Sequence, residues 1–281
     1  MLGSLLISFL TIVNGILLRS PVSLPSKHFV LVHGSCHGAW SWYKVVAVLK
    51  SSGHSVTAID LAASGIDLQQ AKTLKSVSEY HRPLRDFMES LLPHEKVILV
   101  GHSLGGLAIS QAMEMFPDKI SGAVFVTALM PGPALNISTL NKESFSRTGS
   151  LLDSVYTYDD GPNKPPTTLV LGSKYLSSKV YQLSPVEDWA LATMLVRPLR
   201  LFSEEDLSKE LVLTAQNYGS VNRVFIISEK DELSERDFQQ WMIERNPPNE
   251  LVEVLGSDHM VMMSKPRELS GHLLSIARKY I

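Results

Sequence analysis

The chain has 281 residues, 44% hydrophobic and 19% charged, which is typical of a globular protein with a sizeable core. Its formal net charge of −2 gives no electrostatic reason to expect nucleic acid or an acidic membrane surface as a partner. The single cysteine, Cys36, excludes an intrachain disulfide and metal sites built on several thiolates. HExxH, P-loop and GxGxxG motifs are absent from the sequence, so we expect no metal and no cofactor.

The first 18 residues form an uncharged run of mostly Leu, Ile and Val, which Arg19 ends. Its length lies between a signal-peptide core and a short membrane span, and it lacks a basic start and a clear cleavage site. A secretory signal, an uncleaved anchor and an extension without a targeting role therefore stay open. A signal predicts secretion or the endomembrane lumen, and otherwise we expect the cytoplasm; only an anchor predicts membrane contact. We treat residues 1–26 as a separate segment and 27–281 as the folded domain.

Strand and helix patterns alternate after this segment. Continuous apolar runs predict strands at His28–His33, His54–Ile59, Lys96–Val100, Ile120–Leu129, Arg223–Ser228 and Leu251–Leu255. Helical periodicity predicts helices at Trp40–Ser51, Val77–Leu92, Leu104–Met115, Glu235–Arg245 and Lys265–Tyr280. Continuous rather than alternating apolar strands, separated by helices, predict an α/β fold with a mostly parallel sheet covered on both faces.

The alternation is interrupted between about residues 131 and 211. This stretch contains prolines, polar runs and short helical pieces at Ser184–Leu195 and Glu204–Leu211, but no clear strand–helix unit. We expect it to be an inserted cap subdomain that lies over the sheet. The sequon Asn136-Ile137-Ser138 falls within it and is compatible with secretion, although such triplets are common by chance.

Gly101-His102-Ser103-Leu104-Gly105 reads G-x-S-x-G directly between a buried strand and a helix. A serine in this position makes a sharp, strained turn, and the flanking glycines remove the Cβ atoms that would block it. The pattern predicts a serine hydroxyl held at the tip of the sheet beside a helix N-terminus. Ser103 is therefore the candidate nucleophile.

A serine nucleophile needs a base and a group that orients the base, which in this fold follow it in the order acid, histidine. His259 follows a predicted strand, whereas His272 lies inside a predicted helix, so His259 is the candidate base. Asp231 follows the preceding strand and is the candidate acid, with Glu229 as second choice. We expect Asp258, adjacent to the base, to point elsewhere.

The loop from His33 to Gly38 follows the first strand and contains small residues. A backbone N–H in this loop and the N–H of Leu104 are candidates for an oxyanion hole. We interpret His33 and His37 as residues that pack this loop. Cys36 is an alternative nucleophile, but no base lies near it in the sequence, so a buried structural thiol is the simpler interpretation.

Five stretches of the chain carry a family resemblance: His28–Gly34, Cys36–Trp40, Asp60–Gly65, Glu95–Gly106 and Asp258–Met260. They strongly resemble the plant methylesterase family, an α/β-hydrolase group that also contains α-hydroxynitrile lyases. The resemblance extends from about Lys27 to the C-terminus. It implies an α/β-hydrolase fold with a cap. It also implies Ser103 as nucleophile, Asp231 as acid, His259 as base, and an oxyanion hole formed by the N–H groups of Ser35 and Leu104.

The resemblance also implies a carboxylesterase for methyl esters of small apolar acids, such as methyl salicylate, methyl jasmonate or methyl indole-acetate. Lyases of the family have Thr or Asn where this chain has Gly34; some also have Lys at Met260 and Glu at His102. All three positions are of the esterase type. A hydroxynitrile lyase and a ligand-binding protein with little turnover remain the alternatives. The acyl group is not specified by the sequence, and a homodimer is left open.

Overall fold

The computed structural model describes residues 26–147 and 149–280, so all but the last residue of the N-terminal segment at residues 1–26 lies outside the described residues. The central sheet has the strand order β2-β1-β3-β4-β8-β9, and all of its neighbouring strands pair in parallel. Its strands are β1 (His28–Val32), β2 (Ser55–Ile59), β3 (Val97–His102), β4 (Ile120–Val126), β8 (Arg223–Ser228) and β9 (Glu250–Val254). The parallel sheet predicted from the sequence is confirmed, with strand ends displaced by up to three residues.

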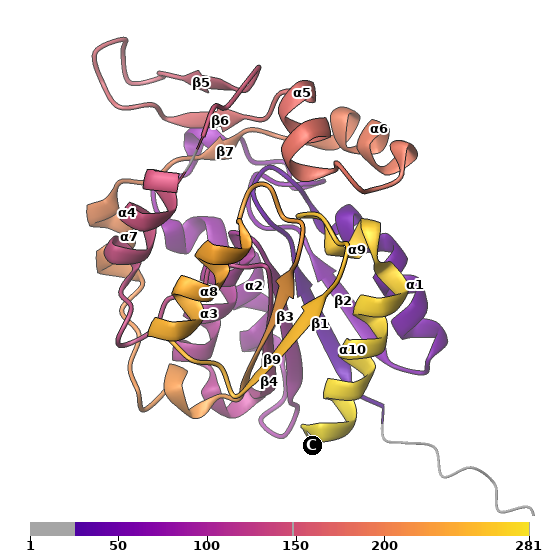
Figure 1. Cartoon of the computed structure of the whole chain (residues 1–281). Helices are drawn as coiled ribbons and strands as arrows, with labels where there is room; N and C mark the ends of the chain where they lie inside the picture. The colour runs from indigo at the N-terminus through magenta and orange to yellow at the C-terminus, as the bar shows by residue number, and fades with distance from the viewer. Residues whose placement is uncertain (1–25, 148, 281) are drawn as a thin grey trace, which may run out of the picture.

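Helices cover both faces of this sheet (Figure 1). Along β1, Phe29 and Leu31 pack into one core cluster, whereas Val30 and Val32 pack into the other. Because side chains alternate along a strand, this division places one core on each face. The first cluster includes residues of α1 (Tyr43–Ser51), α9 (Val261–Ser264) and α10 (Pro266–Lys279); the second includes residues of α2 (Val77–Ser90), α3 (Gly105–Met115) and α8 (Arg236–Arg245).

Local signals explain where α2 begins. The Ser76 hydroxyl accepts a hydrogen bond from the Glu79 backbone N–H at 3.1 Å, and the Glu79 carboxylate accepts one from the Lys75 N–H at 2.8 Å. These reciprocal bonds satisfy N–H groups that have no partner within the helix. Short 3₁₀ helices at Ala39–Trp42, Ala71–Thr73, Pro117–Lys119 and Tyr218–Ser220 complete the connections.

The segment between β4 and β8 forms a cap over one end of the sheet (Figure 1). It contains α4 (Ile137–Arg147), α5 (Ser173–Tyr175), a π-helical turn at Leu176–Val180, α6 (Val186–Leu195) and α7 (Glu204–Glu210). It also contains an antiparallel sheet of β5 (Val155–Thr157), β6 (Thr168–Val170) and β7 (Leu199–Arg200). The sequence indicated α6 and α7 but gave no signal for α4 or for this small sheet.

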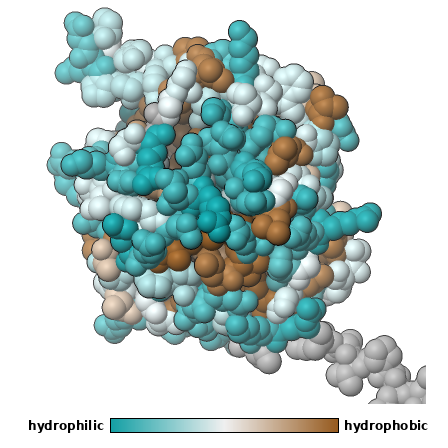
Figure 2. All heavy atoms as spheres, viewed as in Figure 1, coloured by the Kyte–Doolittle hydropathy of each residue, from teal (hydrophilic) through white to brown (hydrophobic). Residues whose placement is uncertain are grey.

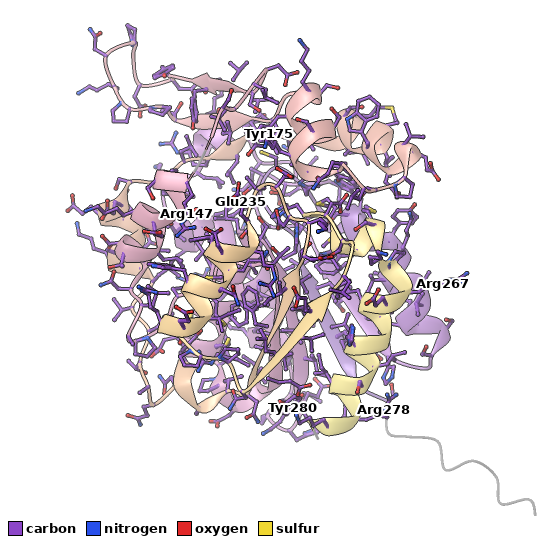
Figure 3. The ribbon with its side chains drawn as sticks, viewed as in Figure 1. Arg147, Tyr175, Glu235, Arg267, Arg278 and Tyr280 are labelled. Atoms are coloured by element: carbon purple, nitrogen blue, oxygen red, sulfur yellow. The ribbon has the colours of Figure 1, made fainter. Side chains whose placement is uncertain are left out.

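The cap is tied to the helices of the main domain. An ion pair of 2.6 Å joins Arg147, at the end of α4, to Asp237 at the start of α8. Figure 3 shows Arg147 beside this end of α8, next to Glu235. Asp188 of α6 accepts hydrogen bonds from Tyr43 and Lys44 of α1. The cap is therefore attached to helices on both faces of the sheet.

On the face shown in Figure 2, hydrophilic side chains predominate and hydrophobic ones form limited patches. In the described part of the chain, no helix is both long and apolar enough to cross a membrane.

Buried histidines make the fold sensitive to acid. Burial lowers the pKa of both His37 and His81 to about 4, from an ordinary value of 6.5. Between pH 6.5 and pH 4 these histidines are protonated in the unfolded chain but stay neutral in the folded one. Stability is therefore retained above pH 6.5 and falls as the pH drops towards 4. At pH 4.5 each histidine lowers the free energy of unfolding by roughly 2–3 kcal/mol relative to pH 7.

Urea unfolding at pH 7 and at pH 4.5 measures this loss of stability. We expect His81→Gln to reduce the loss by about 2 kcal/mol, because glutamine does not titrate. Glutamine also keeps a hydrogen-bond donor for the Gln111 side chain. An equal loss in the variant and the wild type would contradict the assignment of His81 as a neutral buried group.

Candidate active site

Ser103 lies in the sharp turn that the sequence predicted. Its φ of +53° is in the left-handed region, between the end of β3 at His102 and the start of α3 at Gly105. A Cβ atom at Gly105 would lie 2.5 Å from the backbone oxygen of His33, and one at Gly101 would lie 2.9 Å from the backbone oxygen of Gly105. Glycine is therefore required on both sides of the turn, because the backbone that would collide cannot move aside cheaply.

Asp231 and His259 come together from the loops after β8 and β9. The His259 Nδ1 donates a hydrogen bond of 2.7 Å to the Asp231 Oδ2, and both side chains are buried. The Asp231 Oδ1 accepts from the N–H groups of Leu233 at 2.8 Å and Ser234 at 2.7 Å. Because a carboxylate only accepts, Nδ1 of a neutral His259 carries the proton and Nε2 presents a lone pair.

Ser103 and His259 line the same two cavities, but no hydrogen bond joins these two described side chains. His102 connects their backbones: its Nε2 donates to the backbone oxygen of His259 at 2.8 Å, and the two rings lie 4.7 Å apart. The turn that carries Ser103 is thereby fixed against the loop that carries His259. In ligand-free proteins such nucleophile–base bonds are often long and shorten when substrate binds.

The loop after β1 carries Ser35 beside Ser103. The backbone N–H groups of Ser35 and Leu104 donate to no atom of the described residues, and both residues line a cavity with Ser103. His33 and His37 hold this loop. The His33 Nδ1 donates to the backbone oxygen of Gly34 at 2.8 Å, and the His37 Nδ1 donates to that of Ser35 at 2.7 Å.

The other candidates from the sequence lie in different environments. Glu229 accepts from the Gly256 N–H at 2.8 Å, away from His259. Asp258 is buried, which raises its pKa, and it accepts hydrogen bonds from the Leu183 N–H at 3.0 Å and the Ser184 hydroxyl at 2.8 Å, both in the cap. His272 lies within α10. Burial raises the pKa of Cys36 to about 12, so its thiol stays protonated.

Thr127 is a site residue that the sequence did not reveal. Its hydroxyl donates a 2.5 Å hydrogen bond to the Asp231 Oδ2, the oxygen that also accepts from His259. Its φ of +39° is unusual for a β-branched residue, which implies local strain held by the surrounding structure. A threonine after an apolar strand is common, so the sequence carried no signal for this contact.

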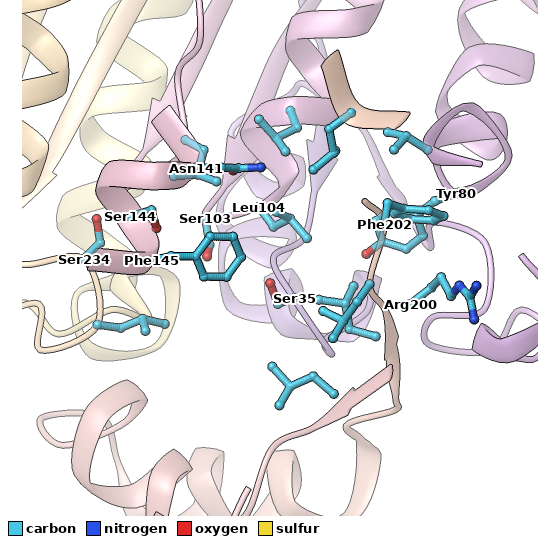
Figure 4. Close-up of a pocket in the computed structure, with 18 of the residues that line it drawn as sticks. Ser35, Tyr80, Ser103, Leu104, Asn141, Ser144, Phe145, Arg200, Phe202 and Ser234 are labelled. Atoms are coloured by element: carbon cyan, nitrogen blue, oxygen red, sulfur yellow. The ribbon is translucent and has the colours of Figure 1, made fainter. Parts of the chain in front are cut away.

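The first cavity, which has a volume of about 240 Å³, extends from Ser103 between α2, α3, α4 and β7 (Figure 4). Its wall is mostly apolar and includes Val77, Leu107, Leu129, Phe145, Phe202 and Leu207. Ser103 and His259 lie on its wall together with Ser35 and Leu104. An apolar group bound there would present its polar end to the serine hydroxyl and the two free N–H groups.

Comparison with known proteins agrees with this fold. The model of the alpha/beta hydrolase family matches residues 29–271. The chain is 53% identical over 255 residues to methyl jasmonate esterase 1 of Vitis vinifera, covering 90% of this chain and 98% of that protein. It is 47% identical over 256 residues to salicylic acid-binding protein 2 of Nicotiana tabacum, with the same coverage.

Among solved structures, tomato methylketone synthase I in complex with 2-tridecanone is 56% identical, with a TM-score of 0.89 and coverage of 92% of this chain and 100% of that chain. The matches extend over almost the whole length of these proteins, at identities far above those at which only the fold is shared. The chain therefore belongs to the alpha/beta hydrolase family and, within it, to the plant methylesterase group.

Proposed function

We propose that the protein is a serine carboxylesterase that hydrolyses methyl esters of small apolar carboxylic acids. The observation that carries the proposal is the Asp231–His259 hydrogen bond of 2.7 Å beside a serine in a strained turn. The name of methyl jasmonate esterase 1 supports the substrate class, and salicylic acid-binding protein 2 is named for binding a small aromatic acid.

In the first half of the reaction, the Ser103 hydroxyl attacks the ester carbonyl carbon while the Nε2 of His259 takes its proton. Asp231 holds the imidazole in the tautomer that can accept this proton and stabilises the imidazolium. The carbonyl oxygen becomes an oxyanion, which the N–H groups of Ser35 and Leu104 stabilise. The C–O bond to methanol then breaks, and His259 gives its proton to the leaving oxygen.

In the second half, a water molecule attacks the acyl-enzyme. His259 takes a proton from the water, the same N–H groups stabilise the second oxyanion, and the Ser103 oxygen leaves with the proton from His259. The free acid is released from the first cavity. The apolar wall of this cavity favours acyl groups that bury hydrocarbon, at about 25 cal/mol per Å² removed from water.

The lyase alternative is disfavoured at Gly34. A Cβ atom there would lie 2.8 Å from the Ser103 Cβ and 2.9 Å from the His102 Nδ1. A threonine or asparagine side chain, which would hold the hydroxyl of a cyanohydrin, has no room unless one of these residues moves. Binding without turnover is disfavoured by the Asp231–His259 pair, which a receptor does not need.

A panel of methyl esters assayed with the full chain tests the proposal. We expect hydrolysis of methyl jasmonate, methyl salicylate or methyl indole-acetate, no cyanide from mandelonitrile, and a fluorophosphonate adduct on Ser103 by mass spectrometry. A β-keto acid and its methyl ester complete the panel because one similar structure is a methylketone synthase. Tight binding of the free acids without ester hydrolysis would contradict the proposal and favour a receptor.

Thr127 is expected to act as a positioning residue for Asp231. Thr127→Val removes one of the hydrogen bonds to a buried carboxylate, worth about 1.5–3 kcal/mol, and should lower kcat by about tenfold or more. Thr127→Ser keeps the hydroxyl and should retain most of the activity. Steady-state kinetics and thermal unfolding of both variants measure the effect. Equal losses in the two variants would indicate a packing role instead.

The family model begins at residue 29, so the apolar segment at residues 1–26 precedes the matched region. We expect this segment to direct a fluorescent reporter into the secretory pathway, because its uncharged, apolar composition suits a signal-peptide core. Microscopy of the fusion beside the untagged reporter measures the effect. A fusion that stays in the cytosol like its control would contradict a signal role.

A further inference from the structure

A second cavity borders Ser103, and the mechanism above leaves it unused. It has a volume of about 140 Å³, and Ser35, Ser103 and His259 line both cavities. Six residues line the second cavity but not the first: His37, His102, Leu151, Leu171, Tyr175 and Val180. The serine hydroxyl therefore lies where two spaces meet.

An ester has two arms, one on each side of the carbonyl carbon that Ser103 attacks. The acyl arm fits the first cavity, which is larger and is lined by both Ser35 and Leu104. The alcohol arm must then extend the other way while its oxygen stays within reach of His259, which protonates it. The second cavity satisfies both requirements, since His259 lines it and Leu104 does not.

The second cavity is far larger than a methyl group. A water molecule occupies about 30 Å³ in the liquid, and an apolar protein cavity of roughly 150 Å³ binds benzene. Methyl esters would therefore leave most of the 140 Å³ unfilled. Its lining is mainly apolar, with Leu151, Leu171 and Val180 contributed by the cap, so an aryl or alkyl group would bury hydrocarbon there.

Tyr175 supplies a polar group in this cavity. The residue is 5% exposed, and its hydroxyl forms no hydrogen bond with the described residues. Burial raises its pKa to about 12, so the hydroxyl is a neutral donor at physiological pH. Figure 3 shows that Tyr175 belongs to the cap, directly above the loops of the site.

We propose that the second cavity is a subsite for the alcohol part of the ester, which accepts alcohols as large as benzyl alcohol and hydrogen-bonds an ether or hydroxyl oxygen in them through Tyr175. The inference rests on the proposed esterase function. It extends the substrate class from methyl esters to esters of larger alcohols.

Methyl, butyl and benzyl esters of one acid test the subsite, with each kcat/KM divided by the rate constant for hydroxide hydrolysis of the same ester. We expect the normalised benzyl value to equal or exceed the methyl value, because added hydrocarbon is buried. A benzyl value more than tenfold below the methyl value would overturn the subsite and leave the methylesterase function standing. Inactivity towards every ester would overturn the function and the subsite together.

Two matched variants locate the binding. Val180→Phe fills the second cavity, whereas Val186→Phe makes the same change on α6 of the cap, where Val186 is 68% exposed. We expect Val180→Phe to lower the benzyl-to-methyl ratio of kcat/KM at least tenfold and Val186→Phe to leave it unchanged. Leu171→Phe is the second filling variant if Val180→Phe does not fold. An unchanged ratio in a folded filling variant would refute the location.

Tyr175→Phe tests the hydrogen bond. A 2-methoxyethyl ester has nearly the shape of a butyl ester but carries an ether oxygen in the chain. We expect the ratio of kcat/KM for the methoxyethyl ester to kcat/KM for the butyl ester to be about fivefold higher in the wild type than in Tyr175→Phe. This factor corresponds to one neutral hydrogen bond. The same ratio of the two esters in the wild type and Tyr175→Phe would remove Tyr175 from the proposal.

Discussion

Ser103→Ala is expected to lower kcat by about 10⁶-fold, because losing the nucleophile of a serine hydrolase removes nearly all of its catalysis. Cys36, the alternative nucleophile in the sequence, does not replace it. Cys36 follows Ser35, but burial raises the pKa of its thiol to about 12, and the Sγ lies 3.6 Å from the backbone oxygen of Leu169. A protonated thiol directed at a carbonyl is not a nucleophile.

The variant should fold normally, since alanine is strained no more than serine by the positive φ, and the Ser103 side chain forms no hydrogen bond with the described residues. Its kcat for a methyl ester, measured with enzyme free of contaminating esterases, is the decisive quantity. Cys36→Ser is the control and should remain within a few-fold of the wild type. Substantial turnover by Ser103→Ala, or its loss in the control, would point to a different nucleophile.

Asp231→Asn is expected to lower kcat by about 10⁴-fold while leaving the fold intact. The Asp231 Oδ1 accepts hydrogen bonds from the N–H groups of Leu233 and Ser234, so the amide oxygen of an asparagine would occupy that position. Its NH₂ group would then face the Nδ1 of His259. The imidazole would accept there and carry its proton on Nε2, where it could not take the proton of Ser103.

Glu229→Gln is the matched control because Glu229 was the other candidate acid in the sequence. Its carboxylate accepts from the Gly256 N–H, so this variant should keep its activity within a few-fold. Steady-state kinetics of both variants, with thermal unfolding to verify the fold, test the assignment. A large loss in Glu229→Gln with normal turnover in Asp231→Asn would reverse the roles of the two carboxylates.

The central sheet and the Asp231–His259 pair could be predicted because each depends on a local signal. Long apolar runs specify buried parallel strands, and the G-x-S-x-G motif specifies the turn at Ser103. Asp231 and His259 were found because strands of a parallel sheet end at the same edge, so residues following β8 and β9 must lie close together. The order of the strands and the positions of their ends were therefore enough to predict that these two side chains, distant in the sequence, lie close together.

The contacts that complete the site depend on tertiary structure. Thr127 donates to Asp231 from a residue with a positive φ, and a threonine in the sequence gives no indication of that backbone conformation. The strands β5, β6 and β7 have two or three residues each, too few for a periodic pattern. Tyr175 and the second cavity depend on how the cap packs against the site, which spacing along the chain does not encode.

Asp258 links the architecture of the cap to the base. This buried carboxylate accepts hydrogen bonds from Leu183 and Ser184 of the cap. Its Oδ1 also accepts one from the Met260 N–H, so Asp258 and Met260, the two neighbours of His259 in the chain, are joined to each other. Lifting the cap as a rigid unit would remove two of these donors, Leu183 and Ser184, from the buried carboxylate. A cap taken from another protein, grafted here to change the substrate specificity, would therefore need hydrogen-bond donors equivalent to those of Leu183 and Ser184. Without them Asp258 would lose its partners in the cap, and we expect the neighbouring imidazole of His259 to be misaligned even if the new pocket fitted the ester.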